Sequence, residues 1–150
     1  MDLIIRNANL PDGRTSIDIG VKDGKIAVLE SSLSAKATEE IDASGKLVSP
    51  PFVDAHFHMD ATLSLGLPRL NHSGTLLEGI ALWGELKPHL TVEAIKERAL
   101  KYCDLAVARG LLAIRSHVDI CDPRLLAVDA LLEVRKEVAP YLSGWAQSGC

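Results

Sequence analysis

The order in which apolar runs and helical patterns follow one another constrains the fold of this chain more than any other feature. Residues 52–56 and 111–118 are short apolar runs of strand length, whereas residues 91–110 and 122–138 carry apolar side chains at helical spacing. The resulting order is strand, long connection, helix, strand and helix, which is typical of βα units in a parallel sheet or barrel. We therefore expect an α/β fold.

Capping residues mark the expected helices. Thr91 precedes the first helical pattern, and Asp122 followed by a proline precedes the second. Between residues 58 and 90 the pattern loses its period and gathers glycine and proline, with one short helix expected at 76–86. An irregular connection of this length in a compact domain usually carries function.

The first 48 residues have a different pattern. Short β-branched runs at residues 3–5, 17–21 and 26–28 are separated by turn residues, and Asp23-Gly24 has the composition of a two-residue hairpin turn. Residues 46–48 then lead to Pro50-Pro51. These runs predict a small group of strands that is separate from the βα part.

Composition excludes several classes of function. With 47% hydrophobic and 24% charged residues the chain can bury one ordinary core, and its net charge of −4 comes from interspersed acids and bases that form no basic stripe. We expect no nucleic-acid polymer as a partner. The apolar runs are shorter than a membrane span, no basic leader is present, and the three cysteines form no close pair. We expect no membrane partner and a cytoplasmic protein.

His56 and His58 are the strongest chemical signal. Residues two apart on a strand point to the same side, so both imidazoles can reach one ion. They stand where an apolar strand meets a glycine-rich connection, and in a (β/α)8 barrel this is the face on which active sites are built. Neutral imidazole is a good ligand for zinc and iron(II). The alternative is two solvent-facing histidines at a strand end.

Four segments extend this pattern and resemble the cytosine deaminase branch of the amidohydrolase superfamily, over residues 51–60, 71–80, 115–119 and 132–140. The resemblance implies an N-terminal part of an incomplete enzyme. Residues 1–48 would be strands of a small β-sandwich domain, and residues 49–142 the first two βα units of a (β/α)8 metal-dependent hydrolase barrel. A complete barrel needs about 250 residues.

The resemblance also implies roles for individual residues. His56 and His58 match two ligands of one divalent metal ion, Fe²⁺ or Zn²⁺, and Leu76 matches a position whose backbone contacts the pyrimidine ring. His117 and Asp119 match the end of the second barrel strand, where they line the pocket without binding the metal. A histidine at a strand end more often completes a hydrogen-bond network, and Asp119 is placed to orient it.

Four further polar residues receive a structural interpretation. Asp54 and Asp60 flank the histidine pair, and we expect them to support a ligand or cap a turn rather than act as bases. His72 and His89 lie in loop contexts, where we expect solvated or cap-associated side chains.

The pattern of the family breaks after Leu142. There the family has a third barrel strand that ends in a substrate-binding glutamine, whereas residues 143–150 contain no apolar run of strand length. We therefore expect a divergent tail in which Gln147 is not that glutamine. The other metal ligands and the proton-shuttling glutamate would lie beyond residue 150. We expect no catalytic residue within this chain and no activity from it alone.

The activity implied is metal-dependent hydrolytic deamination of cytosine or a related nucleobase, giving uracil and ammonia. A metal-activated water attacks the ring carbon that carries the amine, and a carboxylate moves the proton to the leaving ammonia. The alternatives are an amidohydrolase acting on another cyclic amidine, triazine or amide, and a non-catalytic metal-binding or scaffold fragment. The small zinc deaminases are disfavoured because their His-x-Glu and Pro-Cys-x-x-Cys motifs are absent. An open sheet edge predicts a homo-oligomer or an associating fragment.

Overall fold

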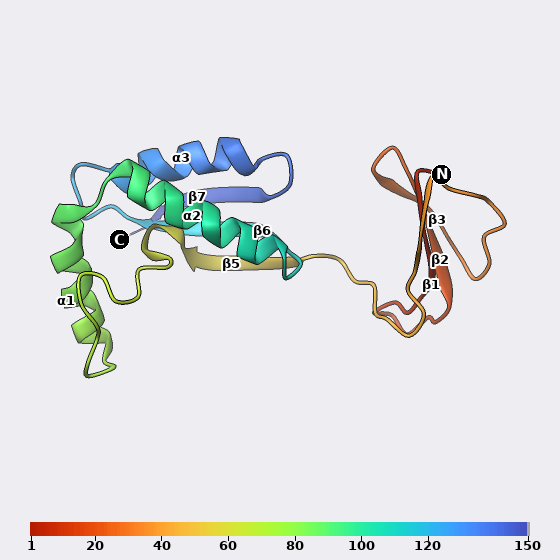
Figure 1. The fold of residues 1–150 in the computed structure, drawn as a ribbon, viewed down its shortest axis with the longest axis horizontal. Coiled ribbons are helices and arrows are strands. Elements are labelled where there is room, and N and C mark those ends of the chain that lie inside the picture. The colour runs from red at the N-terminus through yellow and green to blue at the C-terminus, as the bar shows by residue number, and fades with distance from the viewer. Residues whose placement is uncertain (150) are drawn as a thin grey trace. The chain divides into compact units, whose positions relative to one another are not determined.

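A computed structural model describes the backbone of residues 1–149 and the side chains of residues 1–142. The chain divides into two compact units, Met1–Pro50 and Pro51–Cys150. Figure 1 shows that the first unit is built from strands and that the second contains all of the long helices. Each unit is described by itself below.

The first unit is a four-stranded sheet. Its strands follow the order β3-β2-β1-β4, with β1 antiparallel to β2, β2 antiparallel to β3, and β1 parallel to β4. Their bounds are β1 (Leu3–Ala8), β2 (Ile17–Lys22), β3 (Lys25–Glu30) and β4 (Glu39–Asp42). The expected hairpin turn is confirmed, because both Asp23 and Gly24 have positive φ angles, 53° and 70°, as a two-residue turn between twisted strands requires.

The fourth strand of this unit was not among the runs expected from the sequence. β4, whose sequence Glu-Glu-Ile-Asp lacks strand-like alternation, pairs with β1. Residues 46–48 lie outside the named strands, and an isolated bridge joins Leu47 to Asn9. Arg6 of β1 holds this arrangement because its guanidinium donates to Asp18 at 2.8 Å and to Glu40 at 3.0 Å.

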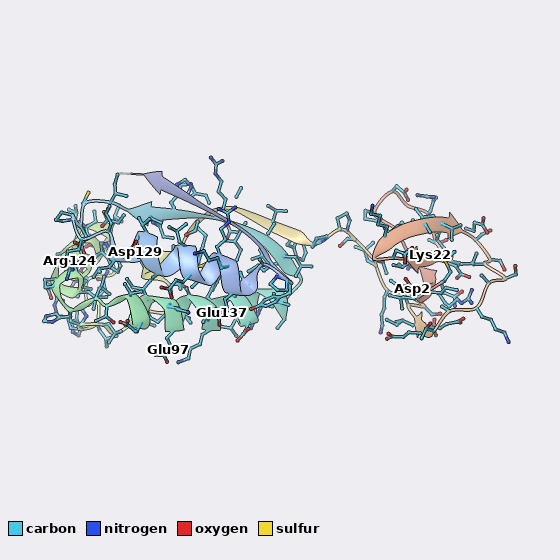
Figure 2. All side chains as sticks on the ribbon, turned by 90° about the horizontal axis from the view of Figure 1, so that it is seen from above. Asp2, Lys22, Glu97, Arg124, Asp129 and Glu137 are labelled. Atoms are coloured by element: carbon cyan, nitrogen blue, oxygen red, sulfur yellow. The ribbon has the colours of Figure 1, made fainter. Side chains whose placement is uncertain are left out.

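The second unit is a parallel sheet covered by helices on one face. The strand order is β5-β6-β7, and α2 and α3 lie together on the same side of these strands (Figures 1 and 2). Short 3₁₀ helices η1 and η2 follow β5 and α1. The elements are β5 (Phe52–His58), η1 (Met59–Ala61), α1 (Leu76–Leu86), η2 (Lys87–His89), α2 (Val92–Val107), β6 (Leu111–Asp119), α3 (Leu126–Val138) and β7 (Ser143–Gly149).

The main core lies between these two helices and the sheet. On β6 the buried residues Ile114, Ser116 and Val118 alternate with residues of the opposite face, as a pleated strand requires. The helices contribute apolar residues at helical spacing, which include Ile95, Ala99 and Cys103 from α2 and Ala130, Leu131 and Val134 from α3. On the surface Lys96 joins the two helices, since its ammonium lies 3.2 Å from Glu133 and 3.1 Å from Glu137, which is labelled in Figure 2.

The helix boundaries follow the sequence signals in two of three cases. The short helix expected at 76–86 is α1, and α2 begins where predicted because Thr91 Oγ1 accepts from the amide of Ala94. The third helix begins at Leu126, later than expected from Asp122. The Asp122 carboxylate instead accepts from the amide and guanidinium of Arg124, and Leu125 has a positive φ of 53°. A carboxylate engaged in its own turn does not cap a helix.

The expectation that no strand follows Leu142 is wrong. Residues Ser143–Gly149 form β7, which pairs parallel with β6 from Ala113↔Ser143 to Asp119↔Gly149. Backbone hydrogen bonds to a neighbouring strand do not require apolar side chains, so a segment rich in small and polar residues can still add to a sheet. Leu142 is the last residue of the connection between α3 and β7. Its side chain is 3% exposed and belongs to the core.

The α/β class is confirmed by this architecture. Within the described part of the chain, no helix combines the length and apolar character that crossing a membrane needs. The cytoplasmic location stays a prediction.

Candidate metal-binding site

Three histidines meet at the carboxyl end of the sheet, on the face opposite to α2 and α3. Phe57 and Met59 pack toward the core, so His56 and His58 lie on the other side of β5. The register places His58 beside His117 of β6. Ring centroids are 5.8 Å apart for His56 and His58, and 5.8 Å for His58 and His117. The structure therefore brings the two predicted ligands and His117 into one cluster.

The histidine pair fits a divalent ion. Two imidazoles bound to one zinc ion at about 2.0–2.1 Å place their ring centroids roughly 5–6 Å apart, and the observed separation of His56 and His58 lies in this range. Among residues 1–142, no group of three or more His, Cys, Asp and Glu side chains is arranged to hold a metal ion. His56 and His58 thus supply two positions of a site that needs further ligands.

His117 takes a different position from the ligand pair. Its ring stacks on that of His56 with centroids 4.0 Å apart and an interplanar angle of 26°. Partial burial, together with the nearby imidazoles of His56 and His58, lowers the pKa of His117 below its ordinary value. A neutral ring packed against a ligand can hold that ligand in place and form a wall of the site.

Asp119 does not orient His117 as expected. Its carboxylate accepts from the Trp83 indole at 2.7 Å and from the amide of Cys121 at 2.8 Å, and the Lys87 ammonium lies 2.6 Å away. Burial alone raises the pKa of Asp119, but these donors outweigh it and hold the pKa well below its usual range. The carboxylate is therefore used to attach the end of α1 to the end of β6.

Leu76 is the first residue of α1, and its side chain is exposed. The turn before it is well ordered by hydrogen bonds, since Thr75 Oγ1 accepts from the Glu78 amide and the Glu78 carboxylate accepts from the amide and hydroxyl of Ser73. The Thr75 amide donates to Ser73 Oγ rather than to Glu78, so the Glu78 carboxylate closes the cap through Ser73. It fixes the backbone at Leu76, whose contact with a pyrimidine stays a prediction.

The two aspartates that flank the histidine pair have different surroundings. Asp54 accepts from the backbone amide of His56 at 3.0 Å. Asp60 is 1% exposed and accepts from the amides of Ala61 and Asp119 at 3.0 and 2.8 Å. Asp60 therefore stabilises η1 from within and joins the ends of β5 and β6.

The other two histidines lie outside the cluster. His72 is exposed in the connection before α1, and His89 is exposed in η2. Both positions agree with the solvated, loop-associated interpretation.

Sequence reasoning missed two residues that support the site. Arg98 of α2 donates to the carbonyls of Asp60 and Thr62 at 3.2 and 3.0 Å, and the Ser116 hydroxyl accepts from the amide of Met59 at 3.1 Å. Both clamp the turn that follows the histidine pair. A charged residue three positions after Ile95, on the apolar side of its helix, was the available signal for Arg98.

β7 changes the position expected for Gln147. The strand register places the Gln147 backbone beside His117. The backbone of this residue therefore belongs to a strand, where a tail without a strand was expected.

Comparison with known proteins identifies the family. Residues 39–140 match the model of the amidohydrolase family. The chain belongs to the amidohydrolase family. The chain is 36% identical to the N-isopropylammelide isopropyl amidohydrolase of Pseudomonas sp. (strain ADP), over 99% of its own length and 39% of that protein.

Solved structures agree with this assignment. A 5-methylcytosine deaminase from Klebsiella pneumoniae, liganded with 5-fluorocytosine, superposes with a TM-score of 0.87 and 38% identity over 95% of this chain and 35% of that one. An atrazine chlorohydrolase from Arthrobacter aurescens TC1, complexed with zinc, shares the fold with a TM-score of 0.67 at 18% identity, over 97% of this chain and 35% of that one.

The comparisons confirm the likeness to cytosine deaminases and the fold expected from it, an N-terminal portion of the amidohydrolase barrel. This amidohydrolase spans less than two-fifths of the length of these relatives.

Proposed function

We propose that this chain is the N-terminal portion of an enzyme that deaminates cytosine or a related nucleobase by hydrolysis. The observation that carries the proposal is the 38% identity, over 95% of the chain, to a 5-methylcytosine deaminase whose structure holds 5-fluorocytosine. The histidine pair at the carboxyl end of the sheet supports it, because hydrolases of this kind need a metal-activated water at that face.

Each residue of the site has a role in this proposal. His56 and His58 would hold one divalent ion, Fe²⁺ or Zn²⁺, which when bound lowers the pKa of a water molecule toward neutrality. His117 holds His56 by stacking and forms part of the pocket wall. The ordered backbone at Leu76 would contact the pyrimidine ring.

A second candidate is hydrolysis of a triazine or another cyclic amidine or amide. It is favoured by the 36% identity, over 99% of the chain, to an N-isopropylammelide isopropyl amidohydrolase. A third candidate is a metal-binding or scaffold fragment without activity, since the missing ligands and proton shuttle would have to come from another segment.

Complementation separates these candidates. Residues 1–142 and residues 1–149 are each joined to the remaining part of the Klebsiella barrel, and release of amine is measured with cytosine, 5-methylcytosine and N-isopropylammelide. We expect chelator-sensitive turnover of the cytosines, loss of turnover with His58→Ala, and no ammonia from the unjoined chain. Preference for N-isopropylammelide would favour the second candidate. A folded, metal-loaded fusion without turnover would favour the third.

A further inference from the structure

The carboxylate of Asp60 has an environment that its two backbone hydrogen bonds alone do not explain. It is almost fully buried at the carboxyl ends of two strands, and each of its oxygens accepts one backbone amide, Oδ1 from Ala61 and Oδ2 from Asp119. A carboxylate oxygen has two lone-pair sites, so acceptor capacity is left over on both oxygens. A buried carboxylate needs hydrogen-bond donors or an opposite charge to offset the loss of its hydration.

The His58 ring lies at one of these oxygens. Its Nδ1 is 3.5 Å from Asp60 Oδ1, longer than a short hydrogen bond and within the reach of a small rotation of the ring. The imidazole of His58 is half exposed, whereas the carboxylate beside it is not. Because the two nitrogens lie on different sides of an imidazole, Nδ1 toward Asp60 leaves Nε2 for an ion.

The carboxylate is itself held in place. Arg98 donates to the backbone carbonyls of Asp60 and Thr62, and its charge interacts with the Asp60 carboxylate. The Met59 amide donates to Ser116, which fixes the same turn to β6. A rigid acceptor is what an orienting group needs, since any mobility in it would pass to the ring.

Asp54 provides the contrast. It is also two positions from a ligand histidine, but the hydrogen bond that the structure gives it joins its Oδ1 to the backbone amide of His56 and not to a ring. Asp54 therefore shapes the strand and does not select the state of an imidazole.

We propose that Asp60 is the positioning residue of the metal ligand His58. Its carboxylate accepts a hydrogen bond from Nδ1–H of His58 and so selects the tautomer whose Nε2 lone pair faces the ion. Through the Asp119 amide it also keeps the ends of β5 and β6 together. The inference rests on the metal site of the proposed function. It makes no statement about which substrate is bound or how fast it is converted.

The tautomer of His58 is the most direct test. Nitrogen-15 NMR of the metal-free wild-type chain, in the solid state if the chain associates, should show His58 protonated on Nδ1 near pH 8. Asp60→Asn should redistribute the proton toward Nε2. A wild-type His58 that carries its proton on Nε2 overturns the proposal, whether or not the variant folds.

Zinc affinity is the second test, measured by competition with a chromogenic chelator in chains whose folding is checked by circular dichroism. Asp60→Asn should weaken zinc binding by about 10- to 100-fold. Asp54→Asn is the matched control, with affinity unchanged. Arg98→Met loosens the same turn but keeps the carboxylate and its two amide donors, so it should weaken zinc binding by less than Asp60→Asn.

The outcomes separate this inference from the proposed function. Unchanged zinc affinity in a folded Asp60→Asn chain overturns the role of Asp60 alone. Wild-type affinity in His58→Ala would overturn the metal site and the proposed function with it. Failure of the complemented enzyme to deaminate cytosine would leave the zinc and tautomer results standing.

Discussion

At the scale of single residues, two imidazoles on one strand determine what this chain can bind. His56 and His58 lie on the same face with ring centroids 5.8 Å apart, which suits two ligands of one ion. Two ligands are half of a four-coordinate site, so we predict weak binding of one zinc ion per chain. The double variant His56→Ala/His58→Ala should lose this binding in a zinc titration.

His72→Ala is the control for that titration. His72 is an exposed histidine outside the cluster, so its removal should leave the affinity unchanged. Equal affinity in the wild type and the double variant would contradict the metal assignment.

Glu78 gives a prediction of pH dependence. Hydrogen bonds from the hydroxyl and amide of Ser73, followed by that from Arg69, lower the pKa of Glu78 from 4.5 to about 2. A carboxyl group whose pKa is depressed by folding stabilises the structure fully above its unfolded pKa, and this contribution is lost as the pH falls through the folded value. The start of α1 should therefore loosen between pH 4.5 and about 2.

Amide hydrogen exchange of α1 as a function of pH measures this effect. Glu78→Gln should flatten the pH dependence, because the neutral amide does not titrate. An equal pH dependence in the variant would assign the loosening to other carboxylates.

At the scale of elements, one carboxylate attaches α1 to the sheet. Asp119, at the end of β6, accepts a hydrogen bond from Trp83 and forms an ion pair with Lys87. Leu82 and Leu86 of α1 are buried. Asp119→Ala leaves the indole and ammonium without this acceptor and should destabilise the docking of α1 by about 1–3 kcal/mol. Trp83 fluorescence and hydrogen exchange of α1 would report the change.

Trp83→Phe is a milder variant for the same test, because it removes one donor and retains most of the packing. It should loosen α1 by less than Asp119→Ala. If Asp119→Ala leaves the exchange of α1 unchanged, apolar packing alone holds the helix and the carboxylate is dispensable for docking.

At the scale of the whole molecule, the second unit has an open side. β5 pairs with β6 alone among the strands of the described residues, and an apolar groove of about 550 Å³ lies beside it. The groove is lined by residues that include Phe52, Phe57, Leu63, Tyr102, Leu105 and Leu111. An unpaired edge beside exposed apolar surface favours association.

We therefore predict that the isolated chain forms oligomers or aggregates in sedimentation experiments. Leu105→Glu, which places a charge in the groove, should reduce association. Leu132→Glu on α3 is the matched control, because Leu132 is 43% exposed and Leu105 is 44% exposed. A monodisperse, cooperatively unfolding wild-type monomer would contradict the prediction.

The sequence by itself determined the local elements and the ligand pair. A short helix was expected at 76–86, where α1 lies, and capping by Thr91 predicted the start of α2. The alternation of a strand placed His56 and His58 on one side. These features depend on residues within a few positions of one another, so a single sequence contains the information.

Only the tertiary structure decided which distant groups meet. β7 forms because its backbone pairs with that of β6, from Ala113 with Ser143 onward. This pairing between distant segments requires no apolar pattern. Asp54 and Asp60 look alike in the sequence, but only Asp60 is buried between strand ends and faces an imidazole ring. Asp119 binds α1 rather than His117 because Trp83 and Lys87 bring two donors to it. A carboxylate takes the donors that the packing of other elements delivers, and its own neighbours in the sequence do not specify them.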